Sequence, residues 1–138
     1  MKTVLFLCTG NSCRSQMAEG FAKELLPKDW KVYSAGIRAD GMNERAIKVM
    51  REAGIDISSQ YSKTADDIKD IRPDILITLC DNAQESCPVY LAQVRKEHWG
   101  LKDPADAKGS EDEIMAVYRK IRNEIQRKIL TSRLFYST

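Results

Sequence analysis

A cysteine and an arginine, Cys8 and Arg14, lie close together near the start of the chain, in a loop rich in small polar residues. Backbone N–H groups of a tight loop that opens a helix form a cradle for a tetrahedral oxyanion. An arginine adds a fixed fork of charged donors, and the positive field favours a nucleophilic thiolate at the cysteine. The sequence therefore predicts an oxyanion site in one continuous loop: Cys8, Thr9, Gly10, Asn11, Ser12, Cys13, Arg14 and Ser15.

The members of this loop have different expected roles. Gly10 permits its curvature, and Ser15 can donate a hydrogen bond to the Cys8 sulfur, which would stabilise the thiolate. Cys13 is expected to pack inside the loop without a chemical role. The alternative is a buried cysteine before an ordinary strand-to-helix turn, but the combination of cysteine, glycine, arginine and serine at one strand end favours the oxyanion site.

Alternating apolar segments surround the loop. Short apolar runs bounded by turn residues predict buried strands, and apolar residues at three-to-four spacing predict helices. Asn43 and the pair Ser110 and Glu113 are typical of helix N-termini, and Gly54 is typical of a helix C-terminus. Val117 belongs to the apolar stripe expected on the last helix. The expected strands cover residues 4–7, 31–36, 75–79 and 94–99, and the expected helices cover residues 14–26, 44–53, 66–70 and 111–129.

Strands that alternate with helices predict an α/β fold. We expect a single doubly wound domain over residues 1–138, with a four-stranded parallel sheet in the order 2-1-3-4 and helices on both faces. Ligands of such folds bind at the carboxyl ends of the strands. Cys8 and Cys80 follow the first and third strands, and Asp103 follows the fourth, so all three should meet at one edge.

Composition excludes several classes of protein. The 138 residues are 43% hydrophobic and 30% charged, which is typical of a globular chain rather than a disordered or membrane-spanning one. Positive and negative residues are interleaved, with a formal net charge of +2, so we expect no nucleic-acid binding. The first apolar run is too short for a signal peptide. We therefore expect a cytoplasmic monomer without membrane contact, whose cysteines are reduced.

The sequence resembles a known family at several separate segments. The loop, Asp103 with Pro104, and the predicted layout resemble the low-molecular-weight protein tyrosine phosphatase fold. More closely, the chain resembles the thioredoxin-coupled arsenate reductases built on that fold, from Val4 to about Ile125. The second cysteine pair, Cys80 and Cys87, separates reductase from phosphatase. The segments that carry the resemblance are residues 8–20, 33–36, 78–80, 87–88 and 97–100.

The resemblance implies a disulfide cascade. Cys8 would attack arsenate while Asp103 protonates the leaving oxygen, and Cys80 would then attack the Cys8 sulfur and release arsenite. Adjacent strands lie about 4.8 Å apart, which is compatible with a Cys8–Cys80 disulfide. Cys87 would next form a Cys80–Cys87 disulfide, which thioredoxin would reduce as the electron donor. No tightly bound cofactor is expected.

Other functions remain open from the sequence. A phosphatase would treat Cys80 and Cys87 as spectators, but Ala105 stands where the phosphatases usually carry an aromatic residue after the Asp-Pro pair. A redox or oxyanion sensor would use the same cysteines without turnover. A zinc site is disfavoured, since the cysteine spacing fits no common zinc motif and the chain has one histidine, His98, which we expect to be structural.

Some of the reductases bind potassium beside the catalytic loop. Asn11, Glu19 and Ser34 match that pattern, whereas Tyr61 and Lys63 stand where a threonine and an aspartate would be expected. A lysine ammonium can supply the positive charge that a cation would bring. We therefore expect weak or absent potassium dependence and no other metal.

Overall fold

The centre of the molecule is a parallel sheet of four strands. A computed structural model describes residues 2–136. Its strands are β1 (Lys2–Cys8), β2 (Trp30–Gly36), β3 (Ile75–Thr78) and β4 (Arg95–His98), in the order β2-β1-β3-β4. The α/β class and the strand order predicted from the sequence are confirmed. β1 is buried along residues 4–8, because it has a strand on each side and covered faces, as its continuous apolar run predicts.

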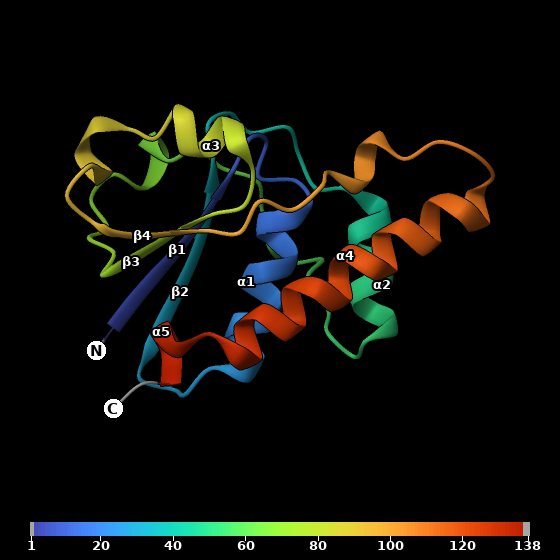
Figure 1. Cartoon of the computed structure of the whole chain (residues 1–138), viewed down its shortest axis with the longest axis horizontal. Helices are drawn as coiled ribbons and strands as arrows, with labels where there is room; N and C mark the ends of the chain where they lie inside the picture. Colours follow the sequence, from blue (N-terminus) through green and yellow to red (C-terminus); the bar gives the residue numbers. More distant parts are fainter. Residues whose placement is uncertain (1, 137–138) are drawn as a thin grey trace.

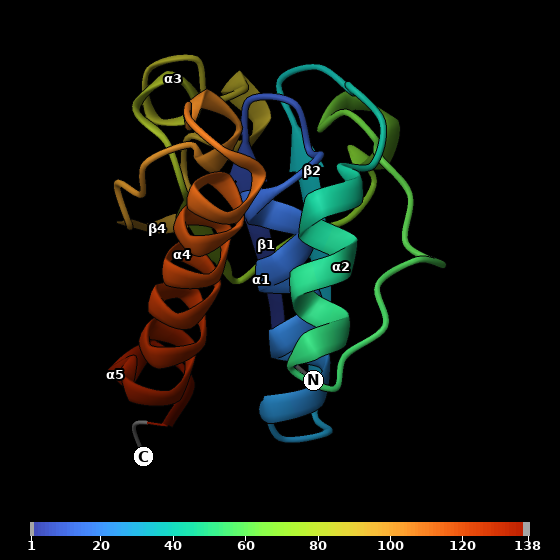
Figure 2. The same ribbon diagram turned by 90° about the vertical axis from the view of Figure 1, so that its right-hand side faces the viewer.

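The two faces of the sheet are covered unequally. Helices α1 (Arg14–Leu25), α2 (Glu44–Glu52) and α4 (Glu111–Thr131) lie on one side, where α1 packs against β1, β2 and α4 (Figures 1 and 2). The opposite side carries only short elements: α3 (Asp81–Glu85) and the 3-10 turns η1 (Asp66–Ile68) and η2 (Val89–Leu91). Helical segments cover both faces, but the long helices gather on one.

Several predicted helix ends are confirmed by their hydrogen bonds. The Asn43 side chain accepts from the Ala46 N–H at 3.0 Å, and Ser110 and Glu113 form a reciprocal capping box. Gly54 follows α2 with a φ of +85°, a conformation that glycine adopts without strain. These signals are local, so the sequence reveals them directly.

Other elements differ from the sequence-based expectation. The helix expected over residues 66–70 is the shorter turn η1, whose N-cap is Ala65 and not Thr64, although the Thr64 hydroxyl accepts from the Asp67 N–H. α3, η2, η3 (Pro104–Asp106) and α5 (Arg133–Tyr136) were not expected. α5 packs back onto the sheet, with the Phe135 ring 5.2 Å from the Trp30 ring.

The carboxyl ends of the strands lie at one edge. β1 ends at Cys8, β3 leads into Cys80, and the segment after β4 leads to Asp103, so the chain brings its candidate site residues to this edge. None of the helices within residues 2–136 is both long and apolar enough to cross a membrane.

Candidate active site

The loop between β1 and α1 turns carbonyl oxygens outward. In a trans peptide, each C=O points opposite to the next N–H, and no cis bond occurs in the described chain. The outward carbonyls therefore leave the N–H groups of residues 9–11 and 13 facing the inside of the loop, as an oxyanion cradle requires. The bonded carbonyls are those of Cys8, Thr9, Gly10 and Ser12, which accept at 2.9–3.0 Å from the N–H groups of Ile37, Arg38, Asp40 and Asn43.

Asn11 holds the loop from within. It is fully buried and has a φ of 47°, a left-handed conformation that asparagine tolerates better than most residues. Its side-chain oxygen accepts from the Lys63 N–H at 2.9 Å and from the Gln16 amide at 2.9 Å. Because every bond of this side chain is buried, the curvature of the loop is firmly fixed.

A chain of hydrogen bonds runs from Asn11 to the Cys8 sulfur. The Asn11 amide donates to the Ser15 hydroxyl oxygen at 2.8 Å. Ser15 is thereby free to donate its own proton to Cys8 Sγ, which lies 2.8 Å from the hydroxyl. The contact between Ser15 and the Cys8 sulfur that is expected from the sequence is therefore present in the structure.

Arg14 lies on the floor of the cradle. Its side chain is 8% exposed, and one guanidinium nitrogen donates to the Leu101 carbonyl at 2.8 Å. The other terminal nitrogen lies 3.6 Å from an Asp103 oxygen. Asp103 is about one third exposed and also accepts from the Ala105 N–H at 3.0 Å. The arginine that would hold the anion is thus next to the carboxyl that would exchange a proton with it.

These residues enclose a small cavity of about 120 Å³. Sites for drug-sized ligands measure about 300–1,000 Å³, so this cavity suits a small ion. It is lined by residues of the loop, of the segment after β2, and of the segment after β4: Cys8, Thr9, Gly10, Ser12, Cys13, Arg14, Arg38, Asp40 and Asp103.

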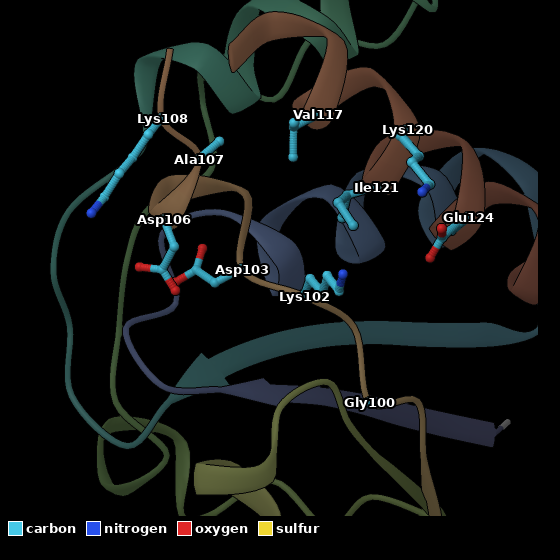
Figure 3. A pocket seen from close by; sticks show the side chains of 10 residues that line it. All are labelled: Gly100, Lys102, Asp103, Asp106, Ala107, Lys108, Val117, Lys120, Ile121 and Glu124. Atoms are coloured by element: carbon cyan, nitrogen blue, oxygen red, sulfur yellow. The ribbon is translucent and has the colours of Figure 1, made fainter. Parts of the chain in front are cut away.

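Asp103 also borders a second cavity, of about 590 Å³. Figure 3 shows Lys120, Ile121 and Glu124 of α4 along one wall and Asp103 and Asp106 toward the other. The Asp103 carboxyl therefore lines both cavities. The cavity also explains Val117, which was expected in the core but is 37% exposed, because it lines this opening.

Cys80 is held against the oxyanion loop. The Thr9 hydroxyl lies 3.2 Å from Cys80 Sγ and accepts from the Asn82 amide at 3.2 Å, which leaves its own proton for the sulfur. The Ala83 N–H also donates to Cys80 Sγ, at 3.4 Å. Thr9 follows Cys8 directly, so Cys80 contacts the residue next to the expected nucleophile, and the Cys8–Cys80 disulfide stays a prediction. Asn82 was missed in the sequence, which offers no signal for it beyond its position after Cys80.

The other two cysteines lie in less favourable surroundings for a thiolate. Cys87 is half-buried, and burial raises the pKa of its thiol, an effect that the nearby Lys96 ammonium opposes. Burial also raises the pKa of Cys13 well above the ordinary range, with a further rise from the Asp103 charge. Cys13 is therefore a neutral packing residue at neutral pH. All four cysteines are free.

His98 connects β3, β4 and α3. One ring nitrogen lies 2.7 Å from the Thr78 hydroxyl, and the other lies 3.0 Å from an Asp81 carboxylate oxygen. This ties the first residue of α3 to the sheet, so His98 has the structural contacts expected of it. Across residues 2–136, no three His, Cys, Asp or Glu side chains gather closely enough to hold a metal ion.

Lys63 lies among the residues at which the resemblance implies a potassium site. Lys63 Nζ donates to the Tyr61 carbonyl at 3.1 Å and lies 3.6 Å from a Glu19 carboxylate oxygen. Glu19 also accepts from the Ser34 hydroxyl and the Lys23 ammonium. Burial lowers the pKa of Lys63, and the Glu19 charge opposes this effect. The oxygens that would bind a potassium ion thus already face ammonium groups, and these residues do not fit the ion.

Fold and site together define an α/β protein with a cysteine and an arginine in an oxyanion loop. The chain belongs to the low-molecular-weight phosphotyrosine protein phosphatase family, whose model matches residues 3–132. It is 54% identical to a protein named arsenate reductase from Bacillus licheniformis, over 93% of this chain and 92% of that protein.

Solved structures agree with this relationship. A structure described as an arsenate reductase in the phosphate binding state is 36% identical, with a TM-score of 0.78, over 94% of this chain and 95% of the other. One described as an arsenate reductase in the oxidized state is 33% identical, with a TM-score of 0.81, over 98% and 96% of the two chains. The resemblance to arsenate reductases on the phosphatase fold is thereby confirmed.

Proposed function

We propose that the protein reduces arsenate to arsenite through a cascade of disulfides. The observation that carries the proposal is the contact of Cys80 Sγ with Thr9, which places a second sulfur beside the oxyanion loop. A phosphatase has no need of such a sulfur. The relatives named arsenate reductase and the related structure in an oxidized state support the same conclusion.

The first step is nucleophilic attack on arsenic. The N–H groups of the loop and the Arg14 guanidinium bind the arsenate oxygens, as the related phosphate binding state supports. The Cys8 thiolate forms a sulfur–arsenic bond, and an arsenate oxygen leaves as water after Asp103 donates a proton. Arsenic remains in its pentavalent state at this stage.

The second step transfers two electrons. The Cys80 thiolate attacks Cys8 Sγ, the sulfur–arsenic bond breaks, and its electron pair stays with arsenic, which leaves as arsenite. The two sulfurs are oxidised to a Cys8–Cys80 disulfide. Phosphorus has no comparable two-electron exit, so phosphate would bind in the same cradle without being reduced.

The third step moves the disulfide away from the oxyanion loop. Cys87 attacks Cys80, and Cys8 leaves as a thiolate, ready for another arsenate. Seven residues at the helical rise span about 10 Å, whereas a disulfide requires Cα atoms about 4.4–6.8 Å apart. α3 (Asp81–Glu85) lies between the two cysteines, so it must unwind for the Cys80–Cys87 disulfide to form.

Thioredoxin completes the cycle by reducing the Cys80–Cys87 disulfide. The apolar side chain of Val89, 91% exposed, follows Cys87 closely and is suited to contact such a partner. A cycle that starts from free thiols suits the cytoplasm, where thiols are kept reduced. We propose a monomer with no tightly bound cofactor, serving arsenic detoxification.

The second candidate function is phosphate ester hydrolysis, which the family model favours. It would use Cys8, Arg14 and Asp103 in the same positions and leave Cys80 and Cys87 idle. The cavity of about 120 Å³ and the small side chain of Ala105 offer little to an aryl group. We therefore expect hydrolysis as a residual activity.

A coupled assay tests the proposal. The protein is mixed with arsenate, thioredoxin, thioredoxin reductase and NADPH, and oxidation of NADPH is followed by absorbance, with aryl phosphate hydrolysis measured in parallel. Arsenate-dependent oxidation that vanishes without thioredoxin is the expected result. Rapid hydrolysis without NADPH oxidation would instead establish the phosphatase, and neither activity would favour a sensor.

A further inference from the structure

An ion pair lies at the mouth of the oxyanion cavity. Arg38 and Asp40, on the segment between β2 and α2, both line the cavity. Arg38 Nε donates to the two Asp40 carboxylate oxygens at 2.9 and 3.0 Å. Their side chains are 67% and 41% exposed, in contrast to 8% for Arg14. Arg38 and Asp40 therefore form the exposed rim of the cavity, whereas the buried Arg14 lies at its floor.

The backbone of the loop fixes the position of this rim. The N–H groups of Arg38 and Asp40 donate to the Thr9 and Gly10 carbonyls, each at 2.9 Å. The Asp40 carboxylate packs so closely against Gly10 that a Cβ there would lie 2.2 Å from Asp40 Oδ2. An oxyanion in the cavity is therefore close to a carboxylate that packs against the loop.

Charge at the mouth is balanced. Asp40 and Asp103 place two carboxylates on the cavity lining, and both would repel an approaching oxyanion. Arg38 neutralises Asp40, as Arg14 does Asp103. Without Arg38, the Asp40 charge would face the incoming anion uncompensated by a neighbouring cation.

Space at the mouth is limited as well. A cavity of about 120 Å³ holds a small ion, and an organic group bonded to that ion would have to extend outward past the rim. We propose that the Arg38–Asp40 ion pair determines substrate specificity, admitting small free oxyanions and disfavouring phosphate esters. This inference rests on the proposed function, since it names the substrate class of the same site.

Protection of Cys8 from alkylation tests the inference when every protein, the one with the wild-type rim included, carries Cys80→Ser, so that arsenate cannot go on to form the Cys8–Cys80 disulfide. The concentrations of arsenate, inorganic phosphate and phenyl phosphate that halve the rate of Cys8 alkylation are measured by mass spectrometry. For Arg38→Gln, we expect the arsenate and phosphate values to rise on the order of tenfold. For Asp40→Ala, which opens the rim, we expect the phenyl phosphate value to fall on the order of tenfold relative to arsenate.

Two further variants separate charge balance from general damage. The double variant Arg38→Gln with Asp40→Asn restores neutrality and should bind arsenate nearly as the wild type does. Arg119→Gln removes another exposed ion pair, with Glu52, far from the loop in sequence, and should change none of the values. An unchanged arsenate value in Arg38→Gln together with an unchanged ratio of phenyl phosphate to arsenate values in Asp40→Ala would overturn the inference alone, whereas a wild-type rim that arsenate fails to protect would overturn the proposed function.

Discussion

Two regions of the molecule differ in how firmly they are held: the loop at residues 8–15 and the segment at residues 80–87. In the proposed chemistry, the loop binds the anion and the segment carries the disulfide away. In the loop, Asn11 and Ser15 are fully buried and joined by hydrogen bonds. In the segment, α3 has five residues, of which Ala83 alone is buried. Bonds between exposed groups contribute little to stability, so the segment can open locally at low cost. The proposed anion binding thus has a site held by buried hydrogen bonds, whereas the proposed disulfide transfer uses a segment that can open.

Replacing the nucleophile should have the largest effect. Cys8→Ser keeps the hydrogen bond to Ser15 but replaces the thiolate by a hydroxyl, so arsenate reduction and aryl phosphate hydrolysis should both fall by about 10⁴-fold or more. Both rates are measured on one preparation. Cys87→Ser is the matched control, because it should retain the hydrolysis. Activity that survives in Cys8→Ser would place the nucleophile elsewhere.

Removing the last sulfur should stop the cycle after one turnover. Cys87→Ser retains Cys8 and Cys80, so it should release one equivalent of arsenite and then stall as the Cys8–Cys80 disulfide. Arsenite is quantified after rapid quenching, and the disulfide is identified by peptide mass spectrometry. Repeated turnovers of this variant with thioredoxin would contradict the relay.

A substitution in the loop at residues 8–15 should lower the free energy of unfolding more than one in the segment at residues 80–87. Asn11→Ala removes buried hydrogen bonds and leaves alanine in a left-handed conformation, so the free energy of unfolding should fall by about 3 kcal/mol. Asn82→Ala removes two exposed bonds, to Thr9 and from Ser86, and should cost less than about 1 kcal/mol. Urea unfolding monitored by circular dichroism measures both. Equal losses would mean that the segment is as firmly held as the loop.

The Cys87 step should depend on pH. Burial raises the pKa of Cys87, so less thiolate exists at neutral pH than for an ordinary cysteine. The rate of Cys80–Cys87 formation should therefore rise with pH, up to about tenfold per unit while the pH stays below that pKa. Lys96→Gln, which removes the charge that lowers the pKa, should slow the step slightly at neutral pH. Single-turnover kinetics provide the rates, and a profile without pH dependence would exclude Cys87 as the attacking group.

The sequence predicts the parts of the site that are local. The apolar run before Cys8 and the caps at Asn43 and Ser110 are signals within a few residues, and the structure contains each of them. Gly10 was expected to permit the curvature of the loop, but Asn11 has the positive φ, and Gly10 instead leaves room for the Asp40 carboxylate. Strand order follows as well, because alternating strands and helices allow few arrangements.

Contacts between distant segments could not be predicted in this way. Asn82 bonds to Thr9 across most of the chain, and Asp40 packs on Gly10 only because the segment after β2 folds over the loop. Val117 follows the apolar stripe of α4 but faces a cavity whose other wall is Asp103. In each case the residue can be read from the sequence, but its contact partner is determined by tertiary packing.

The smallest expected effect concerns potassium, and it tests how the rigid loop is stabilised. Lys63 contacts Glu19 and the Tyr61 carbonyl, and its own N–H donates to Asn11, so an ammonium group already supplies the positive charge beside the loop. The protein should therefore have the same Tm in sodium and potassium buffers of equal ionic strength, measured by calorimetry. Lys63→Gln should lower Tm in both salts, because it leaves the buried Glu19 with one cation fewer. A potassium-specific rise in the wild-type Tm would mean that the loop draws its rigidity from a bound ion, and that Lys63 does not replace it.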